Sequence, residues 1–66
     1  MLESRLKEIL DERGLKYGFV AKKANITNAT MTNLIKGSIP TLPVAYRIAR
    51  TLEMKLEDIW IEEEVE

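Results

Sequence analysis

The segment from Ala24 to Gly37, ANITNATMTNLIKG, combines the boundaries of a short helix with an unusual set of side chains. It holds three Thr and three Asn, which are only moderate helix formers because their side chains compete for backbone hydrogen bonds. On a helical wheel, one side of the segment is apolar. The rest carries short uncharged groups, one methyl group and one cation: Asn28, Ala29, Thr32, Asn33 and Lys36.

These side-chain types suit the edges of DNA base pairs. Asn can pair with adenine through two hydrogen bonds, Thr can meet an acceptor or a thymine methyl, and Ala can contact that methyl. An ordinary solvated helix face would instead carry long, charged, strongly helical residues. A polar surface helix without any ligand remains the alternative, because composition alone does not separate the two.

The elements around this segment are expected to be helices, packed as an all-α fold of five short helices on one core. Leu2, Leu6 and Leu10 recur at helical spacing. Gly14 follows at the position of a C-terminal cap, so the first helix is expected over residues 2–13.

The second helix is expected over residues 17–24 and is followed by a tight turn. Asn25 suits that turn because Asn tolerates the left-handed backbone conformation better than other residues with a side chain. Thr27 is a good N-terminal cap for the third helix, which is expected to end at Gly37.

Two further helices are expected in the C-terminal part. Thr41 can cap the fourth helix, with Pro43 in its first turn, where a missing N–H costs little. The sequence LEDIWI, residues 56–61, indicates a short fifth helix. An extended strand with Ile59 and Ile61 on one side is the alternative for this segment.

Composition excludes several function classes. The 66 residues include no Cys and no His, which removes disulfides, thiolate metal sites and the usual general base. Together with the small core of such a chain, this argues against an enzyme and indicates no metal, cofactor or small-molecule ligand. Apolar runs are too short to span a bilayer, and the first residues do not resemble a signal peptide. The absence of Cys fits a reducing cytoplasm.

Charge is distributed unevenly along the chain. The net charge of −1 conceals a central segment, residues 13–52, that carries seven basic residues and no acidic residue. Residues 53–66 carry seven acidic residues against Lys55. An acid-free segment of this length favours a polyanionic partner for one face of the fold, although chance clustering of solvated charges is the alternative.

The spacing of small and apolar residues fits a helix-turn-helix. This motif needs a small residue in its first helix, a turn residue four positions later and then an apolar anchor. Ala21, Asn25 and Ile26 supply these in order. The remaining core positions of the motif are occupied by Val20, Met31 and Leu34.

At this point residues 2–60 resemble a known family, the Cro/CI-type helix-turn-helix regulators, also called the xenobiotic-response-element or lambda-repressor-like family. The resemblance rests on Val20–Ala21, Ile26–Thr27, Gly37 followed by Pro40, and IARTLEMKLEDIW. It implies a five-helix DNA-binding fold with a helix-turn-helix core over residues 17–36. The whole chain, 1–66, is then one domain, and residues 53–66 form the acidic tail and a possible dimer contact.

The resemblance also implies a sequence-specific transcriptional regulator, most simply a repressor that binds a palindromic operator as a homodimer. The third helix would lie in the major groove. The base readers it implies are Asn28, Ala29, Thr32 and Asn33. The phosphate contacts it implies are Lys16, Tyr17, Lys22, Thr27 and Lys36. The apolar residues expected to be exposed for the dimer contact are Leu56, Ile59, Trp60, Ile61 and Val65.

Such a regulator would act in the cytoplasm on nucleoid DNA, in a bacterium or from a phage genome, without a membrane. The acidic tail is expected opposite the DNA face, since phosphates repel it. The rival class is a protein-binding module of the same fold, an antitoxin or anti-regulator. Core packing is the alternative role for Trp60.

Five positions depart from the family pattern, one of them Lys55, which stands where a capping Ser or Asp is expected. Tyr17 stands where the family usually has a Gln, and Asn25 where it usually has a Gly. Ile35 replaces a frequent Glu and is expected in the core. Ile39 replaces a frequent basic residue, and it could either enlarge the core or form an exposed apolar patch for another subunit.

Overall fold

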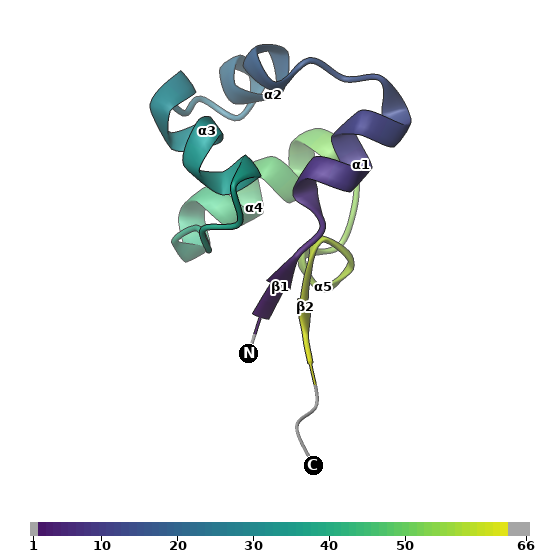
Figure 1. Cartoon of the computed structure of the whole chain (residues 1–66). Helices are drawn as coiled ribbons and strands as arrows, with labels where there is room; N and C mark the ends of the chain where they lie inside the picture. Colours follow the sequence, from purple (N-terminus) through teal and green to yellow (C-terminus); the bar gives the residue numbers. More distant parts are fainter. Residues whose placement is uncertain (1, 64–66) are drawn as a thin grey trace.

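The computed structural model describes residues 2–63, which form five helices and a pair of short strands (Figure 1). In chain order, the elements are β1 (Leu2–Ser4), α1 (Leu6–Arg13), α2 (Tyr17–Lys23), α3 (Asn28–Ile35), α4 (Leu42–Leu52), α5 (Leu56–Ile59) and β2 (Trp60–Glu62). Strands β1 and β2 pair antiparallel and leave the helical bundle together at the end opposite α2 (Figure 1). None of the helices within residues 2–63 has the length and apolar character needed to cross a bilayer.

The expected helix over residues 2–13 is wrong at its start. Residues 2–4 form β1 instead, in register with β2 through the pairs Leu2↔Glu62, Glu3↔Ile61 and Ser4↔Trp60. The fold is therefore mostly helical but not strictly all-α. Both expectations for the C-terminal segment hold in part: a short fifth helix, α5, ends at Ile59, and an extended strand, β2, begins at Trp60, so Ile59 belongs to the helix and not to the strand.

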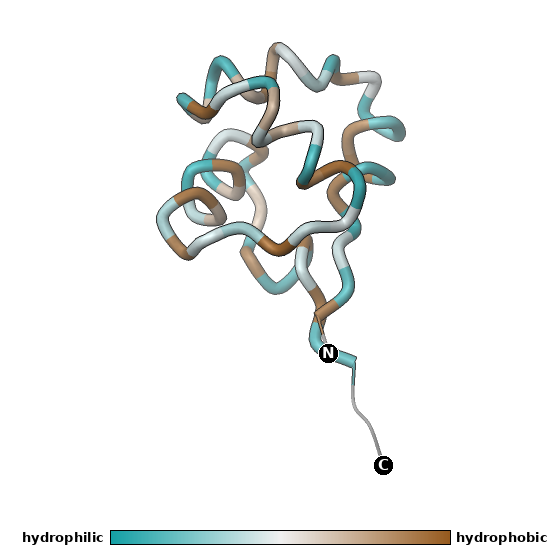
Figure 2. The backbone as a smooth tube through the Cα atoms, turned by 60° about the vertical axis from the view of Figure 1, so that its left-hand side comes forward, coloured by the Kyte–Doolittle hydropathy of each residue, from teal (hydrophilic) through white to brown (hydrophobic). Residues whose placement is uncertain are grey.

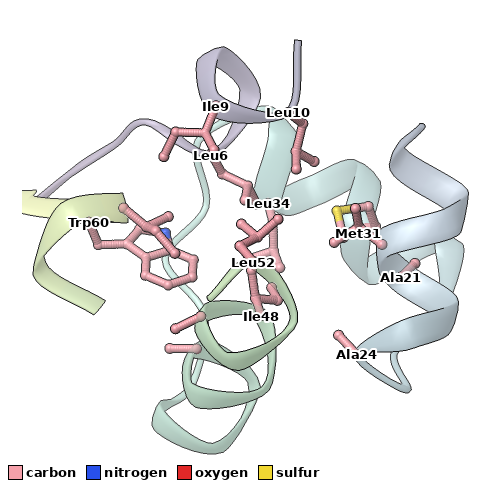
Figure 3. Packing of buried hydrophobic residues seen from close by; sticks show 14 residues of the cluster. Leu6, Ile9, Leu10, Ala21, Ala24, Met31, Leu34, Ile48, Leu52 and Trp60 are labelled. Carbon is pink, nitrogen blue, oxygen red and sulfur yellow. The ribbon is translucent and has the colours of Figure 1, made fainter. Parts of the chain in front are cut away.

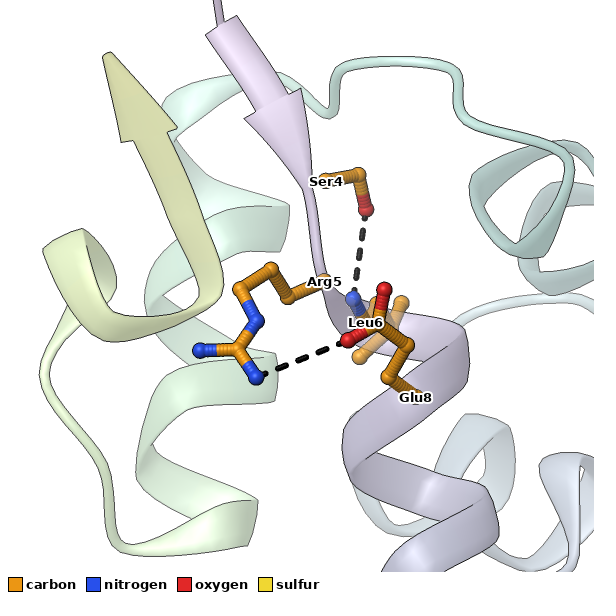
Figure 4. Close-up of polar contacts among 4 residues, drawn as sticks. All are labelled: Ser4, Arg5, Leu6 and Glu8. Atoms are coloured by element: carbon orange, nitrogen blue, oxygen red, sulfur yellow. Dashed lines mark hydrogen bonds and ion pairs between the residues drawn. The ribbon is translucent and has the colours of Figure 1, made fainter. Parts of the chain in front are cut away.

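The change from β1 to α1 has a local cause. The Ser4 hydroxyl oxygen accepts a hydrogen bond from the Leu6 backbone N–H at 3.3 Å, which satisfies one of the free N–H groups at the start of the helix (Figure 4). The Arg5 N–H donates to the Ile59 carbonyl oxygen at 2.8 Å and so ties this junction to the end of α5. The Arg5 guanidinium also lies 3.5 Å from a Glu8 carboxylate oxygen on the solvent side (Figure 4).

Residues with left-handed backbone or capping side chains set the helix boundaries. Gly14 ends α1 at a φ of 66°, and Asn25 follows α2 at a φ of 58°, as predicted from their residue types. The Thr27 hydroxyl accepts from the Thr30 N–H at 3.1 Å and caps α3. Thr41 occupies the N-cap of α4, as expected, although its side chain makes no capping hydrogen bond.

A single apolar core joins the helices, with α4 at its centre (Figure 3). Each helix carries hydrophobic and hydrophilic residues in alternating groups along its length, as an amphipathic helix must (Figure 2). The largest fully buried side chains are Leu6, Leu10, Val20, Met31, Ile48 and Ile59. Ile35 is half-buried against this core, in line with its expected place there.

The expectation that Ile59 and Trp60 are exposed is wrong. Ile59 is completely buried and Trp60 is 6% exposed, so both belong to the core of one protomer. The indole of Trp60 extends from the α5–β2 junction toward the side chains of α1 and α4 (Figure 3). The helix α5 has only four residues, so its apolar side chains can be buried only by turning inward against α4. Val65 lies outside the described residues.

Replacing Ile48 with Ala is expected to destabilise the protein by about 2–5 kcal/mol, because it leaves a cavity at the centre of the core. Urea unfolding followed by circular dichroism measures this loss. The neighbouring exposed substitution Arg47→Ala is the control and should change the free energy of unfolding by no more than about 0.5 kcal/mol. Equal losses in the two variants would contradict the central position of α4.

Candidate nucleic-acid interface

Helices α2 and α3 form a helix-turn-helix whose crossing depends on a small residue and a tight turn. Ala21, on α2, is 1% exposed, so a larger side chain would push α3 outward. Asn25 reverses the chain, and the Ile26 N–H then donates to the Ala21 carbonyl oxygen at 2.9 Å. Ile26 is half-buried and packs against the core, as its predicted role as an apolar anchor requires.

Only one side of α3 is fixed to the core. Met31 and Leu34 are 2% and 3% exposed, which orients the helix and leaves the opposite side in water. The structure places the four predicted base readers and one predicted phosphate contact on this exposed side: Asn28, Ala29, Thr32, Asn33 and Lys36. These residues form the α3 ridge, and no acidic residue lies on it.

Two hydroxyl groups of this region already make hydrogen bonds within the chain. The Thr27 hydroxyl donates to the Thr30 hydroxyl oxygen at 2.9 Å, in addition to its capping bond. The Thr32 hydroxyl donates to the Asn28 carbonyl oxygen at 2.9 Å. Thr32 therefore offers a ligand its methyl group and its remaining lone pairs, rather than a free hydroxyl proton.

A shallow hollow lies between the start of α2 and the start of α3. It is lined by Gly18, Lys22, Asn25, Ile26, Thr27 and Asn28. Lys22 lines this hollow, next to the first turn of α3, where no acidic residue is present. A methyl group at Gly18 would meet only the Asn28 side-chain oxygen, at 3.8 Å, which is an ordinary van der Waals contact, so the hollow does not require a glycine at this position.

Tyr17 is held by an acidic partner that sequence reasoning missed. Its hydroxyl donates to a carboxylate oxygen of Asp11 at 2.6 Å, and the Lys7 ammonium lies 3.1 Å from the other oxygen. The hydrogen bond from Tyr17, followed by that from Lys7, lowers the pKa of Asp11. The same bond raises the pKa of Tyr17, so the phenol stays protonated. Asp11 and Tyr17 lie on either side of the Gly14 turn, and nothing in their spacing along the chain indicates a contact.

Two of the central basic residues have partners within the protein. The Arg13 guanidinium donates to the Leu52 carbonyl oxygen at 2.8 Å and neutralises the C-terminal end of α4. The Lys23 ammonium lies 5.6 Å from the centre of the Phe19 ring, in cation–π geometry. Lys16 precedes α2 as its N-cap residue, and both it and Lys36 are exposed.

Glu62, the last residue of β2, and Glu63, which follows it, lie far from the α3 ridge. The strand pair leaves the bundle at the end opposite α2, so Glu62 and Glu63 lie away from the helix-turn-helix (Figure 1). The neighbouring Glu63 raises the pKa of Glu3, through a shared hydrogen bond and through repulsion between the two carboxylates. This part of the tail therefore lies where the charge argument expected it. Residues 64–66 are outside the described range.

Comparison with known proteins agrees with this geometry. Residues 5–63 match the family described as the Cro/C1-type HTH DNA-binding domain. An uncharacterized HTH-type transcriptional regulator of Archaeoglobus fulgidus is 35% identical over 66 residues, covering 98% of this chain and 93% of that protein. The chain belongs to the Cro/C1-type HTH family.

Further relatives extend over nearly the full chain. A second uncharacterized HTH-type transcriptional regulator of Archaeoglobus fulgidus is 33% identical over 61 residues, covering 91% of this chain and 87% of that protein. The uncharacterized HTH-type transcriptional regulator YgzD of Bacillus subtilis is 29% identical over 65 residues, covering 96% of this chain and 98% of that protein. Membership in the Cro/C1-type HTH family identifies a DNA-binding domain and not an enzyme.

The contact between Asp11 and Tyr17 predicts a pH dependence of stability. The pKa of Asp11 is lower in the folded protein than in the unfolded chain. The stability that the ionised carboxylate contributes is therefore fully present above the unfolded-state pKa of about 3.9, and it is lost as the pH falls through the folded-state pKa. Asp11→Asn should therefore be less stable than the parent near neutral pH, and the gap should shrink below about pH 4. Urea unfolding of both proteins across this pH range measures the difference in their free energies of unfolding. A gap that is the same at both ends of the range would contradict the assignment.

Proposed function

We propose that this Cro/C1-type HTH protein is a sequence-specific transcriptional regulator that binds a palindromic DNA operator as a homodimer. The observation that carries the proposal is the α3 ridge: five exposed residues with short polar, methyl or cationic side chains, on a helix that the core holds from one side only. The relatives named above as transcriptional regulators support the same role. The ridge carries no large exposed apolar side chain, which disfavours the protein-binding alternative for this face.

In the proposed complex, α3 lies in the major groove and the ridge reads base edges. Asn28 and Asn33 each offer an amide that can donate to and accept from adenine. Ala29 and Thr32 offer methyl groups to thymine, and the internal hydrogen bond of the Thr32 hydroxyl favours that apolar contact over donation to a base.

Phosphate contacts flank the ridge in this proposal. Lys22 and Lys36 stand near the two ends of α3, and Lys16 precedes α2. Thr27 contributes through its lone pairs and position at the start of α3, since its hydroxyl proton is already bound. Tyr17 reaches a phosphate only by exchanging its hydrogen bond to Asp11 for one to a phosphate oxygen.

Repression follows from occupancy, because a dimer that covers an operator excludes other proteins from that stretch of duplex. Two half-sites about 34 Å apart, one turn of B-DNA, would place both copies of α3 on the same side of the duplex. The proposed setting is the cytoplasm, with nucleoid DNA as the target.

Asn33→Ala is expected to weaken binding to the selected operator by about 1–3 kcal/mol and to relax preference at one base position, because it removes a two-bond contact with a base. Selection from a random duplex pool identifies the operator for the parent, and repeating the selection with the variant measures the preference. An unchanged preference at every position would remove Asn33 from the readout.

Lys36→Ala is expected to weaken binding to all sequences about equally and to reduce the slope of log K against log salt by about one. Fluorescence anisotropy with operator and scrambled duplexes at several salt concentrations measures both effects. Arg5→Ala, on the solvent side of the β1–α1 junction, is the matched control for loss of one positive charge. A slope equal to that of the parent would show that Lys36 makes no phosphate contact.

A further inference from the structure

Exposed apolar side chains are concentrated on a surface that the helix-turn-helix does not use. Residues 2–63 contain five large hydrophobic side chains that are substantially exposed, and four of them line a single groove. These four are Leu2 at 42%, Ile39 at 47%, Leu42 at 62% and Tyr46 at 57% exposure. The fifth, Phe19, lies on α2 in contact with Lys23.

The groove runs between α4 and the α5–strand region. Small side chains on α4, Ala45 and Ala49, leave it hollow, and Leu56 and Trp60 contribute from the opposite side. This answers the question left open for Ile39: its side chain belongs to an exposed apolar patch and not to the core.

The border of the groove carries charges of both signs. Arg50 and Lys55 line it together with the acidic Glu57. A surface that binds a second copy of itself through a two-fold axis must be complementary to itself, so the charges that it carries should include both signs. A DNA-binding surface would instead be uniformly basic, as in the acid-free α2–α3 region.

We propose that this groove is the surface through which two copies of the chain associate, so the proposal rests on the homodimer of the proposed function. Leu42 and Tyr46 of each protomer cover the groove of the other. An interface of ordinary size covers about 800 Å² on each protomer, about one sixth of the 4864 Å² accessible surface of the chain. The groove, with its four exposed hydrophobic side chains, lies at the centre of that area.

This surface replaces part of the dimer contact expected from the sequence. Ile59 and Trp60 support the groove from within, whereas Leu56 lines it directly. The segment that connects α3 to α4 carries Ile39 into the groove, so the interface lies one short loop away from the recognition helix. Association through this surface therefore fixes how the two copies of α3 are oriented.

Leu42→Glu tests the proposal. Leu42 is the first residue of α4, and an acidic side chain in a first helical turn is favourable, so the variant is expected to fold. Placing two carboxylates in an apolar interface should raise the dimer dissociation constant at least about tenfold, measured by sedimentation equilibrium. Tyr46→Glu should act in the same direction. Phe19→Glu is the matched control, an equally exposed apolar residue outside the groove, and should leave association unchanged.

DNA binding separates the two proposals. The groove variant should bind a single operator half-site as the parent does, but should lose the additional affinity for the complete palindrome. A parent that fails to bind any duplex, yet dimerises and is dissociated by Leu42→Glu, would overturn the regulator and support the groove. A parent that remains monomeric, or groove variants that dimerise as well as the parent, would overturn the groove even if DNA binding persists.

Discussion

The constraint on which the site depends is that α3 is fastened along one side only. Met31 and Leu34 are the two side chains of α3 that are nearly fully buried, and the Thr27 cap holds its first turn. A helix of eight residues has little stability of its own, so these contacts and the Ala21 crossing must supply it. Because these contacts fix the orientation of α3, its outward-facing residues are not needed to hold the helix in place. This is why they can be weak helix formers such as Asn and Thr.

Charge placement follows from the same division between an anchored side and an open side. Among the central basic residues, Arg13 serves the fold at the end of α4, Lys22 and Lys36 remain exposed near the two ends of α3, and Arg50 lines the groove beside α4. The strand pair carries Glu62 and the following Glu63 to the opposite end of the molecule. Asp11 is the exception near α2, and its contacts with Lys7 and Tyr17 satisfy its charge locally. A polyanion approaching α3 therefore meets cations first.

The features that the sequence predicted correctly are those with local causes. The Thr27 cap and the left-handed turns at Gly14 and Asn25 each depend on residues within one helical turn. The strand β1 could not be predicted from the local sequence, because Leu2 fits the helical spacing of α1 equally well. Its pairing partner, at Ile61 and Glu62, lies some sixty residues along the chain. The contact of Asp11 with Tyr17 likewise depends on how the turn between α1 and α2 folds.

The strand pair also completes one side of the apolar groove. Pairing of β1 with β2 brings Leu2 to the end of the chain where Trp60 enters the core, so residues from both termini meet beside α4. If residues 2–4 had continued α1 as a helix, this side of the groove would have been absent. Leaving Leu2, Ile39, Leu42 and Tyr46 in water gives a chain of this size no folding free energy from their burial. In the proposed dimer, covering them with a second copy would recover that free energy and would couple the association of two protomers to the orientation of their two α3 helices.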